Sequence, residues 1–125
     1  MALKILIVED ERPIAKALQL KLTSSGYEAT VAADGMQAIS ELEKNKFDLI
    51  LLDLIMPNLD GFGFLDAIKG KPNLPPIIVS SNLSQQEDID KAKSKGAVGY
   101  YVKSNTPLSA IIQQINQYLP HETRQ

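Results

Sequence analysis

The sequence contains no cysteine and one histidine among its 125 residues, and these shortages exclude the usual staples of small folds. A disulfide framework needs paired cysteines, and a structural zinc site needs several cysteine or histidine ligands. With 44% hydrophobic residues, the chain can bury about two-thirds of its unfolded surface, which is enough for a core without staples. We expect one domain, because this length lies near the modal domain size.

The sequence also lacks an excess of charge of one sign and any long hydrophobic run. Its 13 basic and 15 acidic residues give a net charge of -2, and the lysines form no stripe that would neutralise nucleic-acid phosphates. The longest apolar runs, residues 5–8 and 49–52, are too short to span a bilayer, and residues 1–4 lack the layout of a secretion signal. We therefore expect no direct nucleic-acid binding, no membrane association and a cytoplasmic location.

Apolar segments of strand length alternate with amphipathic stretches, which is typical of a parallel sheet with helices on both faces. The predicted strands are 4–10, 28–33, 47–53, 77–81 and 98–103. The predicted helices are 12–25, a segment from Asp34 through Leu42, a short segment around 64–68 that stops near Gly70, 84–96, and a last one from Thr106-Pro107 to Leu119. The fold class is therefore α/β.

Several helix boundaries have recognisable signals. Pro13 stands in the first turn of the first helix, and Gly26 lies just past its end. Asp34 with Gln37, and likewise Ser84 with Glu87, resemble capping boxes that open the second and fourth helices. The fourth helix carries few apolar residues and should be thinly anchored. We expect a domain over 1–120 and a polar tail over 121–125, with no room for a linker and an output module.

The strand compositions predict the order of the sheet. The first, third and fourth strands are unbroken apolar runs, typical of strands buried on both faces, whereas the second and fifth carry Glu28, Thr30 and Gly99. The second and fifth strands should lie at the edges, as in the order 2-1-3-4-5 of the flavodoxin-like doubly wound fold. In that fold, ligands bind between the carboxyl ends of the first and third strands.

Polar residues leave the predicted strands at this carboxyl edge: Glu9, Asp10, Asp53, Ser81 and Lys103. Each alone is more often a cap or a solvated turn than a functional group. Together, three converging carboxylates would repel one another unless a cation compensates. Oxygen ligands favour Mg²⁺ or Mn²⁺ over zinc or copper.

These residues resemble the receiver domain of two-component response regulators, the CheY-like family. The similarity covers essentially the whole chain and rests on four motifs: Ile5-Leu6-Ile7-Val8-Glu9-Asp10-Glu11, residues 48–57 with Asp60-Gly61, Pro76-Ile77-Ile78-Val79-Ser80-Ser81, and Gly96-Ala97 followed by Tyr100-Tyr101-Val102-Lys103.

The resemblance implies a role for each matching residue. Asp53 would accept a phosphoryl group, and Asp10, Asp53 and the backbone carbonyl of Ile55 would bind the metal, with Glu9 assisting through water. Ser81 and Lys103 would contact the phosphoryl group, and Tyr100 would fill the space vacated when Ser81 draws its loop inward. We expect Tyr101 to be an exposed edge residue.

The resemblance also implies partners. A sensor histidine kinase or phosphotransfer protein would phosphorylate Asp53. A downstream target, or a second copy of the chain, would read the surface formed by the fourth helix, fifth strand and fifth helix. The chain would be a signalling protein and not a metabolic enzyme.

Four positions depart from the family pattern or bear on its kinetics. Asn82 stands where a small residue is usual, and Ser104 replaces the proline that usually follows the lysine. Either the bond between Lys103 and Ser104 is trans and the loop differs, or strain is stored there. Apolar Ile55 and Leu83 would flank the acyl phosphate and hinder an attacking water.

Three other functions compete with this interpretation. A flavodoxin would need a phosphate-binding loop rich in Ser, Thr and Gly where this chain has residues 9–12, which are charged. A phosphatase of the haloacid dehalogenase type would need a second acid where Ile55 stands. A pseudo-receiver, which binds proteins without phosphorylation, remains the main rival because of Asn82 and Ser104, although Asp10, Asp53 and Lys103 are present.

Overall fold

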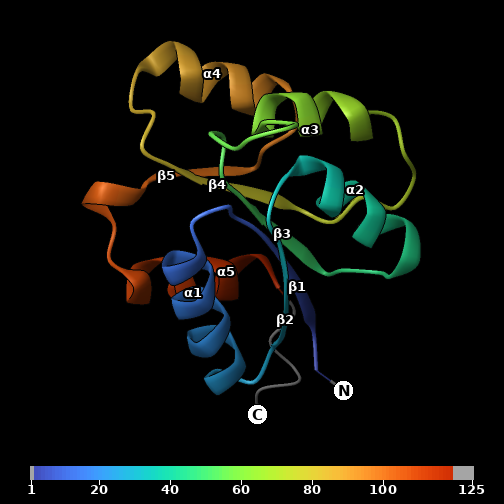
Figure 1. The fold of residues 1–125 in the computed structure, drawn as a ribbon. Coiled ribbons are helices and arrows are strands. Elements are labelled where there is room, and N and C mark those ends of the chain that lie inside the picture. The colour runs from blue at the N-terminus through green and yellow to red at the C-terminus, as the bar shows by residue number, and fades with distance from the viewer. Residues whose placement is uncertain (1, 120–125) are drawn as a thin grey trace.

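The computed structural model describes residues 2–119, which form a five-stranded parallel sheet flanked by helices (Figure 1). The strands follow the order β2-β1-β3-β4-β5, so the predicted α/β architecture and its sheet order are confirmed. The elements in chain order are β1 (Lys4–Val8), α1 (Arg12–Ser24), β2 (Glu28–Ala32), α2 (Gly35–Lys44), β3 (Leu49–Leu52), α3 (Gly61–Ile68), β4 (Ile77–Ser81), α4 (Gln86–Ser94), β5 (Gly99–Val102) and α5 (Leu108–Tyr118). A short 3-10 helix, Lys103–Asn105, lies between β5 and α5.

Two hydrophobic clusters form the core, one on each face of the sheet. In Figure 1, α1 and α5 cover one face and α2, α3 and α4 cover the other. Along β1, Leu6 and Val8 join the cluster with α2 and α3, while Ile5 and Ile7 join the cluster with α1 and α5. Successive strand residues point to opposite faces, which explains why a central strand reads as an unbroken apolar run.

The two edge strands are less buried than the central ones, as their composition predicts. Every residue of β5 is half-buried, whereas every residue of β3 and β4 is buried. The expectation that Tyr101 is exposed is wrong, because its ring packs against the cluster beside α1 and α5. This burial raises the pKa of the Tyr101 hydroxyl to about 12.

The helix signals have mixed outcomes. The side chain of Asp34 accepts a hydrogen bond from the Gln37 N–H at 2.9 Å, which confirms the cap of α2. The cap predicted at Ser84 is wrong: α4 begins at Gln86, with Gln85 at the N-cap position and no side-chain cap. Hydrogen bonds at Asn82 and Leu83 hold the preceding loop to the β5 side of the molecule, and the helix begins only beyond it.

Two further predictions concern the ends of elements. Lys103 was expected to end the fifth strand, but it begins the 3-10 helix, and none of the described peptide bonds is cis. Only Ala92 of α4 is fully buried, so the thin anchoring predicted for this helix is confirmed.

Pro120 and the expected polar tail lie outside the described residues. Between residues 2 and 119 no helix has the length and apolar character needed to cross a membrane.

Candidate functional site

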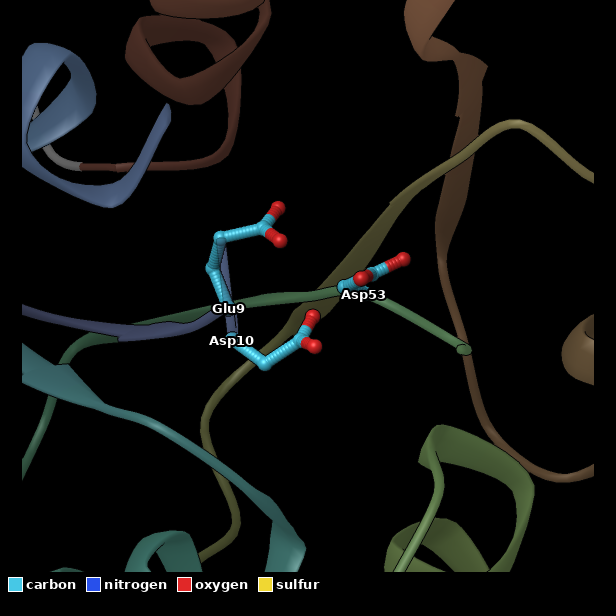
Figure 2. A group of neighbouring side chains, drawn as sticks. All are labelled: Glu9, Asp10 and Asp53. Carbon is cyan, nitrogen blue, oxygen red and sulfur yellow. The ribbon is translucent and has the colours of Figure 1, made fainter. Parts of the chain in front are cut away.

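Three carboxylates meet where β1 and β3 end. Figure 2 shows Glu9 and Asp10, which follow β1, facing Asp53, which follows β3. One carboxylate oxygen from each residue lies within 4.8 Å of the others. The parallel register places Val8 opposite Leu52, and the Asp53 N–H donates to the Val8 carbonyl at 2.9 Å. The pairing of two neighbouring strands therefore brings distant acids into one cluster, as the sequence predicted.

Lys103 places a positive charge against this cluster from the β5 side. Its ammonium nitrogen lies 2.5 Å from Glu9 Oε1 and 3.4 Å from Asp53 Oδ2. The side chains of Glu9 and Asp53 are only 3% and 6% exposed, so this ion pair is largely shielded from water. The sequence predicted that Lys103 approaches Asp53, but it did not predict the direct contact between Lys103 and Glu9.

Burial and charge shift the pKa values of this cluster. Burial raises the pKa of Glu9 to about 7, because the Lys103 ammonium offsets only part of the desolvation and the Asp53 charge adds to it. Burial also raises the pKa of Asp53, against the opposing effect of Lys103. Burial would lower the pKa of Lys103, yet its hydrogen bond to Glu9 and the charge of Asp53 raise it above its ordinary value. The cluster thus holds more negative charge than one lysine balances.

A shallow depression of about 230 Å³ opens onto the cluster. The residues that line it are Asp10, Glu11, Asp53, Ile55, Asn82 and Lys103. Ile55 stands at its mouth with 57% of its surface exposed, and its backbone N–H donates to Asp53 Oδ1 at 3.4 Å. Leu83 does not line this depression and packs on the core cluster beneath α3 and α4. Of the two apolar residues expected to flank Asp53, only Ile55 therefore borders the opening.

Contacts outside the cluster hold the loop between β3 and α3. A Cβ on Gly61 would lie 2.6 Å from the Asp53 carbonyl oxygen, so only glycine fits this close approach. Asn58, with φ of 67°, donates from its side chain to Asp34 Oδ2 at 2.7 Å. The loop that follows Asp53 is therefore fixed both by α3 and by the residue that caps α2.

Ser81 and Tyr100 do not line the depression. Ser81 is fully buried, and its hydroxyl oxygen accepts from the Leu83 N–H at 3.3 Å. The half-buried Tyr100 donates its hydroxyl to the Leu83 carbonyl at 2.6 Å, and burial raises its pKa. Both side chains therefore contact the loop between β4 and α4.

The donor set of the cluster fits a hard divalent cation. Three carboxylates supply oxygen ligands only, which suits Mg²⁺ or Mn²⁺ rather than zinc or copper. A cation there would also relieve the repulsion between Glu9 and Asp53. The sequence placed Glu11 and Asn58 in the loops after the first and third strands without a role at the site, and it predicted Asp34 only as a helix cap. The turn-forming residues around Asn58 predicted a loop, but no local pattern identifies Asp34 as its partner.

Comparisons with known proteins agree with this geometry. The sequence model of the response regulator receiver domain matches residues 5–116. A probable transcriptional regulator ycf27 of Cyanidium caldarium is 38% identical over 113 residues, which cover 89% of this chain. The structure of the Vibrio cholerae chemotaxis protein CheY4 superposes with a TM-score of 0.88 at 29% identity, covering 95% of this chain and all of that one.

A third relative is the response regulator protein TrrA of Thermotoga maritima, whose structure was solved in complex with Mg²⁺ and BeF. It has a TM-score of 0.82 at 27% identity and covers 94% of this chain and 99% of its own. The curated relatives are longer: the chain spans 45% of the Cyanidium caldarium protein.

Proposed function

This chain belongs to the family of two-component response regulator receiver domains, and from that premise we propose that Asp53 accepts a phosphoryl group from a sensor histidine kinase or a phosphotransfer protein. One observation carries the proposal. The Asp53 carboxylate lies beside the carboxylates of Glu9 and Asp10 and 3.4 Å from the ammonium of Lys103, at the edge of an open depression.

The transfer is a displacement at phosphorus. A carboxylate oxygen of Asp53 forms the new P–O bond while the P–N bond to the donor histidine breaks, and the leaving imidazole takes up a proton. With a small acyl phosphate donor, a P–O bond breaks and a carboxylate such as acetate leaves. Both reactions end with an acyl phosphate on Asp53.

We propose that the same acids bind Mg²⁺, for which Mn²⁺ could substitute. Asp10, Asp53 and the backbone carbonyl of Ile55 would hold the ion, and Glu9 would support it through water. When bound, the cation neutralises negative charge on the transferring phosphoryl group. The structure of TrrA with Mg²⁺ and BeF supports this choice of ion for a protein of similar fold.

Lys103 and Ser81 are proposed to hold the phosphoryl group after transfer. The Lys103 ammonium already contacts Asp53, so it can pair with a phosphoryl oxygen after a small movement of its side chain. Ser81 can donate its hydroxyl, which in this structure accepts from the Leu83 N–H. Turning that hydroxyl toward Asp53 would exchange the contact with Leu83 for one with phosphate.

We propose that α4, β5 and α5 form the output surface, read by a downstream protein or by a second copy of the chain. Leu83 connects the site to this surface, because its backbone forms hydrogen bonds with the side chains of both Ser81 and Tyr100. The weak anchoring of α4 allows a modest change in contacts to move it. Such signalling would take place in the cytoplasm.

The experiment is phosphorylation by acetyl phosphate followed by intact mass measurement. The parent protein should gain the mass of one phosphoryl group with Mg²⁺ and none with EDTA, whereas Asp53→Asn should gain none. Asp90→Asn, on the exposed side of α4, is the matched control and should label like the parent. If the parent stays unlabelled at saturating Mg²⁺, the chain is a pseudo-receiver and the proposal fails.

A further inference from the structure

The side chain of Asn82 joins two loops at the edge of the site. Its Oδ1 accepts a hydrogen bond from the backbone N–H of Ser104 at 3.0 Å. Asn82 directly follows β4, and Ser104 is the second residue of the 3-10 helix that follows β5. The bond therefore connects residues that are 22 positions apart.

The Ser104 N–H needs a partner from outside its own turn. The first N–H groups of a helix have no acceptor within the helix, and a side-chain oxygen commonly supplies one. A proline at position 104 would have no N–H to donate, and it would disfavour the helical backbone that Lys103 adopts. Ser104 thus permits the turn, and Asn82 satisfies the donor that this turn exposes.

This bond fixes the backbone from which Lys103 extends. Lys103 is the first residue of the turn and Ser104 is the second, so a bond to the Ser104 N–H restrains the peptide that joins them. Asn82, Lys103 and Asp53 all line the same depression. The Asn82 amide therefore lies close to the charge that balances Asp53.

A second hydrogen bond restrains the same region from the other side of Lys103. The Tyr100 hydroxyl, three positions before Lys103, donates to the carbonyl of Leu83, the residue after Asn82. The loop after β4 is thus attached to the β5 segment both before and after Lys103. Loss of the Asn82 contact would free only the side that follows Lys103.

We propose that Asn82 is a positioning residue for Lys103, an inference that rests on the proposed phosphorylation of Asp53. Its hydrogen bond to Ser104 holds the Lys103 turn so that the ammonium lies against Glu9 and Asp53. Asn82 and Ser104, which both depart from the family pattern, are therefore one coupled pair: the amide oxygen supplies the acceptor that a proline would not need.

The test is a double-mutant cycle on the initial rate of phosphorylation by acetyl phosphate with Mg²⁺. Asn82→Ala removes the acceptor and Ser104→Pro removes the donor. Each should lower the rate by about threefold to tenfold, the equivalent of one lost hydrogen bond. The double variant should be no slower than the slower single variant, because both changes remove the same bond. Ser84→Ala, at an exposed position of the same loop, is the control and should match the parent.

An amide NMR spectrum supplies a readout that does not depend on activity. Asn82→Ala should move the Ser104 amide proton upfield and speed its hydrogen exchange, while Ser84→Ala should leave it unchanged. The inference would be overturned if the two single-variant rate reductions multiplied in the double variant. It would also be overturned if Asn82→Ala were phosphorylated faster than the parent, because Asn82 would then hinder access to Asp53. Absence of labelling in the parent would instead refute the phosphorylation of Asp53, while the Ser104 amide would still report whether the bond exists.

Discussion

The Asp53 carboxylate is buried, and its burial disfavours the ionised form of the side chain. Burial raises the pKa of Asp53 and raises the pKa of neighbouring Glu9 to about 7, while the Lys103 ammonium contacts both carboxylates. A carboxyl group whose pKa is higher in the folded than in the unfolded state destabilises the fold wherever the unfolded chain is ionised. A cation bound beside these carboxylates would therefore relieve an unfavourable charge in the folded protein.

The first prediction concerns the stability of Asp53→Asn. Without metal at pH 7, this variant should have a higher free energy of unfolding than the parent, because it removes a buried charge with little change of shape. The difference should shrink as the pH falls toward 4, where the unfolded aspartate also becomes protonated. Urea unfolding at several pH values measures it, and a variant less stable than the parent at pH 7 would contradict the charge balance described for this cluster.

The second prediction concerns metal binding by the parent. Because a ligand that binds only the folded state stabilises it, millimolar Mg²⁺ should raise the melting temperature of the parent. Asp53→Asn should show a much smaller rise, since it lacks one of the anionic ligands. Buffer that contains EDTA and no added Mg²⁺ is the reference state. An equal rise in both proteins would place the ion elsewhere on the molecule.

A third prediction concerns the lifetime of the acyl phosphate. The Ile55 side chain offers no hydrogen bond to an attacking water at the mouth of the depression, whereas a side-chain amide there could orient one. Ile55→Asn should therefore shorten the half-life of phosphorylated protein by about threefold or more. Leu83 is left unchanged in this test, because it packs on the core. Loss of the mass gain over time measures the decay, and an unchanged half-life would refute this role of Ile55.

At the scale of elements, the loop between β3 and α3 is positioned by close backbone packing. Gly61→Ala should lower the free energy of unfolding by about 2 kcal/mol or more. The new Cβ would lie 2.6 Å from the Asp53 carbonyl oxygen and 2.7 Å from the Leu54 Cα, and both of these are backbone atoms. Gly63→Ala is the matched control, since its Cβ would meet mainly the flexible end of Leu59 and Ala favours a helix. Urea unfolding compares the two. An equal loss of unfolding free energy in both variants would show that the loop between β3 and α3 can shift to accommodate a Cβ at position 61.

The fourth helix has a different kind of attachment. Apart from buried Ala92, it is connected to α3 by the ion pair of Lys95 with Asp66 and by the Lys91 ammonium over the Phe62 ring. Exposed polar contacts of this kind are weak, so a new contact at Ser81 can compete with them. This helix is the element expected to respond to phosphorylation.

Amide NMR with a beryllofluoride mimic of the phosphoryl group tests that response. Amides from Leu83 to Gly96 and around Tyr100 should shift more than those of α1. The same addition to Asp53→Asn should shift neither group and serves as the control. Shifts confined to the loop after Asp53 would show that α4 does not respond.

For the whole molecule, regular patterns predicted most of the architecture. Unbroken apolar runs marked β1, β3 and β4 as central, and the sheet order then brought Asp10, Asp53 and Lys103 to one edge. Such inferences succeed because period and burial are properties of a whole segment. The sequence could not have given the pairing of Glu9 with Lys103, since this depends on side-chain geometry across the sheet.

The local errors have physical causes. Two predictions were wrong near the contact of Asn82 with Ser104: the helix cap at Ser84 and the strand end at Lys103. A long-range hydrogen bond overrides the local sequence signal there. Tyr101 was expected to be an exposed edge residue, but its packing against the cluster beside α1 and α5 leaves it half-buried. Tertiary contacts decide such positions, and a single sequence does not record them.

The most direct test of the central role of Asp53 is to locate the phosphoryl group chemically. After labelling with acetyl phosphate and Mg²⁺, borohydride reduces an acyl phosphate to an alcohol, which leaves homoserine in place of the modified aspartate. Peptide mass mapping should find homoserine at position 53 and at no other aspartate, including neighbouring Asp10. Homoserine at a different position, or none in protein that had gained phosphoryl mass, would contradict the assignment of Asp53 as the phosphoacceptor.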